Sequence, residues 1–187
     1  LGKVTHKPLY GNLLAGKPFT VNYAMGWTGD IFGENDVLGA DPTTFGLTNG
    51  KRGNNASYTP WSSFAIVEGK DLEFIVNLDK PTEVSKVIFG SLFNPAMRML
   101  PAGGIAVEVS ADGQQYTQIA EKTLKHDCPE TGRIAFTDSI EFEPAQATFL
   151  KVKIKNGGTL RNGVNFEKNN GPEVIPAELW IDEIEAY

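Results

Sequence analysis

Strict alternation of apolar and polar residues is the feature that most constrains the fold of this chain. Apolar residues occupy every second position of 72–78, and the same pattern recurs in 105–109 and 150–154. Successive side chains of a β-strand point to opposite faces, so this pattern predicts strands with one buried and one wetted face. In the third stretch, the wetted positions are lysines (Lys151, Lys153 and Lys155), which also suit an exposed edge strand.

The intervening residues indicate turns rather than helices. Twenty glycines and eleven prolines break the chain of 187 residues at frequent intervals. Pro81 separates the strand ending at Leu78 from a β-branched and aromatic run over 84–93. About eight strands at this spacing predict a two-sheet sandwich or jelly roll, and the lack of crossover helices excludes a parallel α/β fold.

In the last predicted strand, the alternation of apolar residues shifts from one face to the other. Leu179 and Ile181 share one face, whereas Ile184 falls on the other. A β-bulge near Asp182 would restore the alternation, and it would also change the direction of the Glu183 side chain.

Charge and composition exclude several classes of protein. The net charge is −6 with both signs interspersed, which leaves no basic stripe for nucleic acid. No apolar run approaches the roughly 20 residues of a membrane span. Cys128 is the single cysteine, so no intrachain disulfide forms. The chain starts at Leu1 without a methionine, and we expect it to be part of a longer or processed protein, with 1–187 one domain and 1–18 a lead-in.

Catalysis is not predicted. His6 and His126 are isolated in the sequence. His126, Asp127 and Cys128 are adjacent, but neighbouring residues on a strand point to opposite faces, which argues against a thiol nucleophile. No pair of acidic residues shows a glycosidase pattern.

Five motifs follow one another along the chain: LTNGKRG at 47–53, WSSF at 61–64, NLDKPTEV at 77–84, VEVSADG at 107–113 and LWIDEIE at 179–185. Their order resembles that of the discoidin-like, coagulation-factor C-type superfamily. The resemblance covers roughly residues 15–187 and is closest to the family 32 carbohydrate-binding modules that trail bacterial β-N-acetylhexosaminidases and chitobiases.

The resemblance implies a fold and a function. The implied fold is an eight-stranded antiparallel jelly-roll β-sandwich of the galactose-binding-domain-like type. The implied function is non-catalytic: the module binds glycans, of the galactose or N-acetylhexosamine type, and targets an attached catalytic domain to them. A secreted, periplasmic or cell-surface bacterial protein is expected.

The resemblance also implies a structural Ca²⁺ between the 47–53 loop and the last strand. Ca²⁺ takes about six to eight oxygen ligands. The implied side-chain ligands are Asn49, Ser57 and Glu183, with backbone carbonyls near residues 45, 51–52, 54 and 182. The family usually has Asp where this chain has Asn49, which removes one charge. The alternatives are a simple turn at Asn49, a solvated Glu183, a loop held by hydrogen bonds, or a Na⁺ ion.

A sugar site needs an aromatic platform beside planar hydrogen-bonding groups, because a sugar ring has an apolar C–H face and projecting hydroxyls. The segment 93–99, the long loops predicted at 25–36 and 156–176, and the loop at 61–62 contain such residues. Phe93 and Trp61 are better explained as core residues than as ligands, Arg98 is better explained as a solvated charge, and Trp180 is expected in the core. No histidine accompanies the 61–62 pair, which argues against a strict galactose site. The candidates are Trp27, Phe32, Trp61, Ser62, Asn94, Arg98 and Phe166.

Two other functions are compatible with the same sequence. A discoidin-type adhesion or protein-interaction domain would expose a contiguous apolar patch on these loops. A structural module packed on a catalytic domain would bury Trp27 and Phe166 or turn them towards a partner.

Overall fold

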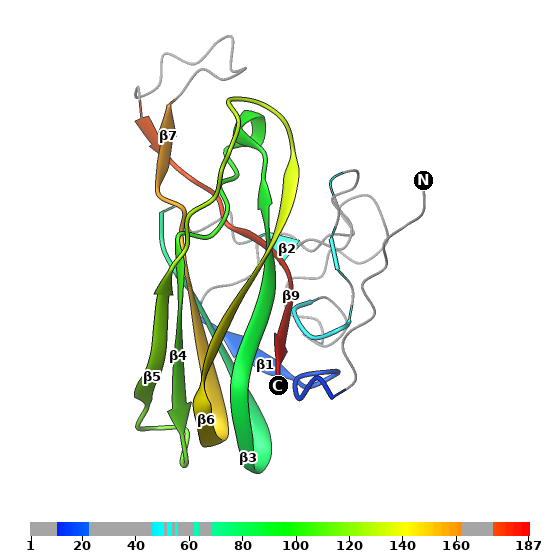
Figure 1. Cartoon of the computed structure of the whole chain (residues 1–187), viewed down its shortest axis with the longest axis vertical. Coiled ribbons are helices and arrows are strands. Elements are labelled where there is room, and N and C mark those ends of the chain that lie inside the picture. Colours follow the sequence, from blue (N-terminus) through cyan, green and yellow to red (C-terminus); the bar gives the residue numbers. More distant parts are fainter. Residues whose placement is uncertain are drawn as a thin grey trace.

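The chain folds as an all-β antiparallel sandwich, as predicted (Figure 1). The computed structural model describes residues 11–22, 46–50, 52–53, 55, 62–63, 69–161 and 174–187. In chain order its elements are β1 (Phe19–Val21), β2 (Ser62–Ser63), β3 (Leu72–Phe93), the 3₁₀ helix η2 (Pro95–Met97), β4 (Gly104–Ser110), β5 (Thr117–Thr123), β6 (Ile134–Lys155), β7 (Thr159–Arg161), β8 (Val174–Pro176) and β9 (Trp180–Ala186).

Two strands of 22 residues, β3 and β6, join the two layers of the sandwich. They pair with each other on both sides of an interruption between Asn77 and Thr82, where Asp79 has a φ of 71°. On one side of this bend they pair with β1 and β4, and β4 pairs with β5. On the other side β3 pairs with β9, which pairs with β2. Each long strand therefore serves in both layers.

The bend corrects one expectation from the sequence. Pro81 does not separate two strands, because it lies inside the continuous strand β3. Proline lacks a backbone N–H, and the β3–β6 ladder is already interrupted at this point, so no ladder hydrogen bond is lost.

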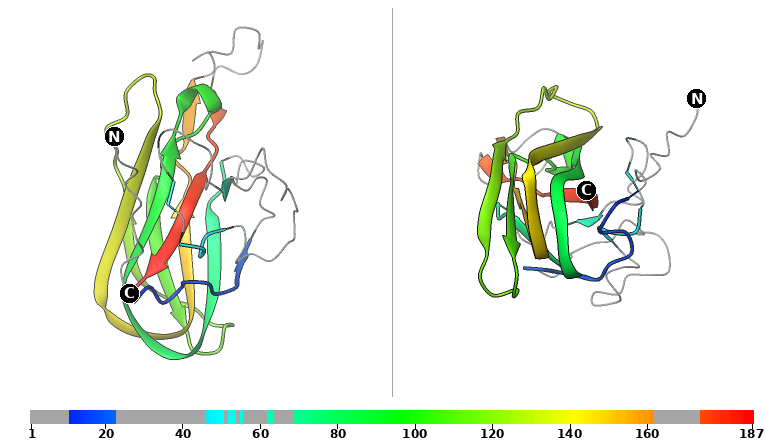
Figure 2. Two further views of the ribbon diagram at one scale, coloured as in Figure 1. Left: turned by 90° about the vertical axis from the view of Figure 1, so that its right-hand side faces the viewer. Right: turned by 60° about the horizontal axis from the view of Figure 1, so that its bottom comes forward.

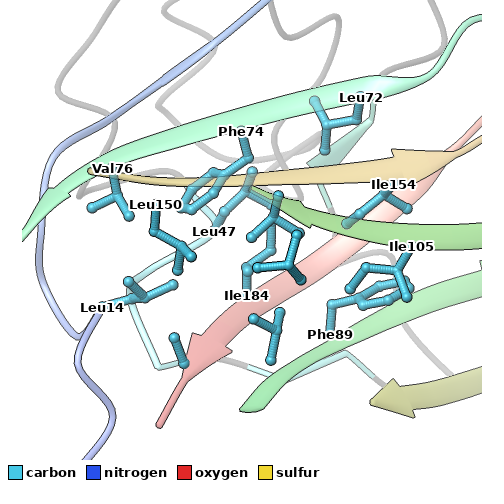
Figure 3. Packing of buried hydrophobic residues seen from close by; sticks show 14 of the residues in the cluster. Leu14, Leu47, Leu72, Phe74, Val76, Phe89, Ile105, Leu150, Ile154 and Ile184 are labelled. Atoms are coloured by element: carbon cyan, nitrogen blue, oxygen red, sulfur yellow. The ribbon is translucent and has the colours of Figure 1, made fainter. Parts of the chain in front are cut away.

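The alternating residues form the core, as predicted. The side chains that face inward from β3, β4 and β6 are completely or almost completely buried, and they meet those of β9 between the layers (Figure 3). Residues labelled in the figure include Leu72, Phe74, Val76, Phe89, Ile105, Leu150, Ile154 and Ile184.

The lysines of β6 lie on the wetted face, but they do not mark an edge. This half of β6 pairs with β3 on one side and with β4 on the other. Lys153 Nζ lies 2.6 Å from Glu108 Oε1, and Lys151 Nζ lies 3.4 Å from Glu108 Oε2. Burial alone would raise the pKa of Glu108, but these two lysines hold it below its usual value. Charge pairing across neighbouring strands therefore accounts for the lysines.

The predicted bulge in β9 is confirmed. Between Phe89 and Ser91, two steps along β3 correspond to three steps along β9, from Ile184 to Ile181. The extra residue lies at Asp182–Glu183, and it allows both isoleucines to reach the core.

The segment before β1 packs beside the end of β9 (Figure 2). Leu14 is fully buried in the core, and the Leu13 N–H donates to the Ala186 carbonyl at 2.9 Å. Among the residues described, no helix has the length and apolar character needed to cross a membrane.

Candidate functional site

A buried arginine ties the segment 46–53 to β9. Arg52 Nη1 donates to Asp182 Oδ1 at 3.0 Å and to the Glu183 carbonyl oxygen at 3.2 Å. Arg52 Nη2 donates to Glu185 Oε1 at 2.5 Å. The Arg52, Asp182 and Glu185 side chains are only 7%, 3% and 5% exposed. We call these three residues and Glu183 the Arg52 cluster.

Backbone groups complete the environment of Asp182. Its Oδ2 accepts the Gly53 N–H at 2.8 Å, and its Oδ1 accepts the Glu183 N–H at 2.5 Å. Gly90 of β3 makes room for this carboxylate, since a Cβ atom there would lie 2.3 Å from Asp182 Oδ1. Nearby, the Ile184 N–H donates to the Leu47 carbonyl at 2.7 Å, which fixes the loop to the strand.

Glu183 has one carboxylate oxygen that is not satisfied by the described part of the chain. Its Oε1 accepts the Gly50 N–H at 2.9 Å, whereas its Oε2 is buried and has no hydrogen-bond partner among the described residues. Burial raises the pKa of Glu183 to about 8, against the opposing effects of the Gly50 N–H and Arg52. Burial also raises the pKa of Asp182, although Arg52 opposes the shift.

The calcium ligands implied by the sequence can be compared with this geometry at two positions. Glu183 Oε2 suits a hard cation, because a cation would supply the partner that this buried oxygen lacks. Asn49 is half-buried next to Gly50, and Ser57 lies outside the described residues. Within the described part of the chain, no three His, Cys, Asp or Glu side chains form a metal-binding group. A cation here would therefore depend on amide and carbonyl oxygens as well as Glu183.

A second polar group lies at the end of the sandwich that carries η2, β7 and β8 (Figure 1). Asn94 and Met99 close the short segment around η2: each backbone N–H donates to the other residue's carbonyl at 3.0 Å. Arg98 follows η2 with a φ of 60°, in the left-handed region that favours glycine. The structure thus places Asn94 and Arg98, both predicted from the sequence, in one tight turn.

Glu178 and Trp180 belong to the same group, although the sequence analysis does not single them out as site residues. Arg98 Nη2 donates to Glu178 Oε1 at 2.9 Å, and Trp180 Nε1 donates to Glu178 Oε2 at 3.1 Å. Arg98 and Glu178 are 80 residues apart, so no local pattern could have indicated the pair. We call Asn94, Arg98, Glu178 and Trp180 the Arg98 group.

The two core expectations near this group are confirmed. Phe93 is 2% exposed and Trp180 is 3% exposed, so neither presents a ring to solvent. Trp180 packs with Leu92 and Met99 in a small hydrophobic cluster beneath the segment 94–99.

The prediction of a loop over 156–176 is wrong near its ends, where 159–161 and 174–176 form the paired strands β7 and β8. The residues that flank these two strands lie beside the segment 94–101. A Cβ atom on Gly157 would lie 2.4 Å from the Pro101 carbonyl oxygen, and the Asn156 side chain donates to the Ala177 carbonyl at 2.9 Å. The other predicted sugar-site residues, Trp27, Phe32, Trp61 and Phe166, lie outside the described residues. For Ser62, the backbone pairs with Ile181 in β9.

His126 and Cys128 show no arrangement for nucleophilic catalysis. His126 Nε2 lies 2.9 Å from Asp138 Oδ2, and its ring packs 4.6 Å from that of Phe136. Burial raises the pKa of the Cys128 thiol, and the Asp127 carboxylate adds to the shift. A reactive cysteine requires the opposite shift.

Solved structures of sugar-binding modules superpose on almost the whole chain. Chitosan-binding module 1 of a chitosanase/glucanase from Paenibacillus sp. IK-5 is 19% identical, with a TM-score of 0.50 over 95% of this chain and 99% of the module. Module 2 of that enzyme, in complex with chitotriose, is 18% identical, with a TM-score of 0.50 over 94% and 99%. A fucose-binding module of Streptococcus pneumoniae is 16% identical, with a TM-score of 0.50 over 94% of each chain.

No protein-family model matches the chain, and no curated protein matches it. At these identities, the superpositions establish a shared fold. The chain is structurally similar to carbohydrate-binding modules, and the all-β sandwich inferred from its alternating residues is the fold of those modules.

Replacing Arg52 by alanine is expected to lower the free energy of unfolding by about 3–5 kcal/mol, because it leaves buried carboxylates without their counter-charge. Denaturant unfolding measures the change. Lys17→Ala is the control, since it breaks an exposed ion pair with Asp79 and should cost no more than about 1 kcal/mol. Equal losses in the two variants would contradict the structural importance of the Arg52 cluster.

The raised pKa of Glu183 predicts a pH dependence of stability in metal-free buffer with a chelator. Between its ordinary pKa of 4.5 and about 8, the folded protein retains a proton that the unfolded chain has lost. This contribution to stability is therefore full below pH 4.5 and is lost as the pH rises to about 8. Glu183→Gln should unfold with a flatter pH profile across this window. Parallel profiles for the two proteins would show that Glu183 ionises normally.

Proposed function

We propose that this chain is a non-catalytic carbohydrate-binding module that keeps an attached glycoside hydrolase domain on its glycan. The observation that carries the proposal is the Arg98 group, a fixed and partly exposed guanidinium at one end of a sugar-binding-module fold. The Arg98 side chain is 32% exposed, and Glu178 holds it in place. A planar donor in this position suits hydroxyl oxygens of a saccharide.

Apolar surface accompanies the polar group. Met97, in η2, is 47% exposed, and Val174, at the start of β8, is 52% exposed. These are the exposed large hydrophobic residues among those described, and both belong to elements at the end that carries Arg98 (Figure 1). Among the described residues, apolar side chains therefore lie at the same end of the sandwich as the planar donor, as binding of a sugar ring requires.

The sugar-stacking aromatics remain a proposal from the sequence. We assign this role to Phe166, Trp27, Phe32 and Trp61, with Ser62 as a further contact. The position of the residues that flank the 156–176 loop supports Phe166, because Asn156 and Ala177 lie beside the segment 94–101. The resemblance in sequence supports galactose- or N-acetylhexosamine-type ligands and a β-N-acetylhexosaminidase or chitobiase as the attached enzyme. Binding to such glycans fits a secreted, periplasmic or cell-surface location.

Titration calorimetry with chitotriose, galactose and fucose tests the function. We expect weak binding of at least one sugar, and at least a tenfold loss of affinity in Arg98→Ala, since a hydrogen bond to a charged group contributes about 1.5–3 kcal/mol. Lys80→Ala is the control, because Lys80 lies in the bend of β3, in the part of β3 farthest from η2. If a glycan array with Ca²⁺ shows no binding at all, the chain is a structural module instead.

We further propose a structural Ca²⁺ at Glu183, with Asn49 and Ser57 as additional ligands. The buried, unpartnered Glu183 Oε2 supports this proposal. The bound ion would keep Glu183 ionised and would hold the 46–53 segment against β9. It would add to the tie that Arg52 already forms.

Thermal unfolding with Ca²⁺ or with a chelator tests the ion. At a hundredfold excess over its dissociation constant, Ca²⁺ should raise the melting temperature by about 5–10 °C, and Glu183→Gln should abolish most of this shift. Lys80→Ala should keep the whole shift. Identical melting of the unaltered protein in Ca²⁺ and in chelator would exclude a structural calcium ion.

A further inference from the structure

Glu178 contacts both the backbone and the side chain of Arg98. The Glu178 N–H donates to the Arg98 carbonyl at 2.7 Å, and Glu178 Oε1 accepts from Arg98 Nη2 at 2.9 Å. The neighbouring residue, Met99, forms a parallel bridge with Glu178. Backbone and side chain of Arg98 are thus fixed by the same residue, which limits the positions that the guanidinium can take.

Glu178 is itself fixed from the other side. Its second oxygen, Oε2, accepts from the indole Nε1 of Trp180, and Trp180 is buried against Leu92 and Met99. The Glu178 side chain is only 12% exposed, whereas that of Arg98 is 32% exposed. The carboxylate is more buried than the guanidinium, and a ligand that reaches Arg98 meets a positive group paired with a carboxylate at 2.9 Å.

From this pairing we infer that Glu178 is a positioning and specificity-determining residue, which cancels the charge of Arg98 so that the site takes neutral saccharides rather than uronic or sialic acids. The inference rests on the proposed sugar-binding function. A neutral hydroxyl can both accept from a guanidinium N–H and donate to a carboxylate oxygen. The carboxylate of an acidic sugar can only accept, and it would approach the negative charge of Glu178.

The strained backbone of Arg98 agrees with such a role. A left-handed φ at a residue other than glycine is strained and persists where surrounding contacts enforce it. Here the Arg98 N–H donates to the Pro95 carbonyl at 3.1 Å, and the Arg98 carbonyl accepts from Glu178. The contacts with Glu178 therefore stabilise a conformation that presents the side chain at the end of the sandwich.

The test compares matched neutral and acidic sugars by titration calorimetry: methyl galactoside with methyl galacturonide, and methyl glucoside with methyl glucuronide. The unaltered protein should bind the neutral member of a pair at least tenfold more tightly than the acidic one. Glu178→Gln keeps the shape and an oxygen for Arg98 but removes the charge. It should improve binding of the acidic member at least tenfold, and this gain should shrink as salt is added.

Two variants separate charge from folding. Arg98→Gln combined with Glu178→Gln removes both charges and should lose the gain for acidic sugars. Glu141→Gln, which removes the partner of Lys86 on the β3–β6 ladder, should leave both affinities unchanged. Melting temperatures of all variants show whether they are folded.

The outcomes distinguish this inference from the proposed function. Tight binding of acidic sugars by the unaltered protein, or an unchanged neutral-to-acidic ratio in Glu178→Gln, would overturn the role of Glu178 while leaving sugar binding in place. Failure of the unaltered protein to bind either member of both pairs would overturn this inference, and a glycan array without any binding would overturn the proposed function as well.

Discussion

The buried ion pairing of Arg52 is the interaction on which the rest of the structure depends. One guanidinium bonds to the carboxylates of Asp182 and Glu185 and to the carbonyl of Glu183, and all of these lie on β9. Breaking such a pair leaves charges in a medium that solvates them poorly, so the loop and the strand must fold together. The same arrangement accounts for the raised pKa of Glu183, because the carboxylate is buried, and the neighbouring carboxylates of Asp182 and Glu185 add to the effect of burial. It also explains why an additional cation would be stabilising there.

β9 connects this cluster with the candidate sugar site. Trp180 is its first residue and bonds to Glu178, which in turn holds Arg98, while the bulge that contains Asp182 begins two residues further on. The strand pairs with β3 on both sides of this bulge, and its first two residues also pair with β2, so its two ends are held by the same neighbouring strand. A rigid support of this kind reduces the entropy lost when a ligand binds, which matters for weak sugar contacts. The Arg52 cluster and the Arg98 group are therefore connected through the same strand.

The sequence predicts the layers of this fold well, because burial acts on every second residue of a strand. The shift of the alternation between Ile181 and Ile184 even locates the bulge in β9. Sequence patterns do not predict contacts between residues that are far apart along the chain. The side chain of Arg52 pairs with Asp182, 130 residues away, and Arg98 pairs with Glu178, 80 residues away. Nor does a local pattern reveal that Pro81 lies in a bend of one long strand, since proline is equally compatible with a strand end.

The central claim is that a saccharide binds at the Arg98 group on a scaffold that stays fixed. Two-dimensional ¹H–¹⁵N correlation spectra during titration with a neutral sugar measure this most directly. We expect the amide signals of residues 94–99 and 178, together with the Trp180 indole Nε1–H, to shift with one common dissociation constant. Signals of Gly50 and Gly53 should remain in place. Shifts confined to the wetted faces of the sheets, with the Trp180 indole signal unchanged at saturation, would contradict the account.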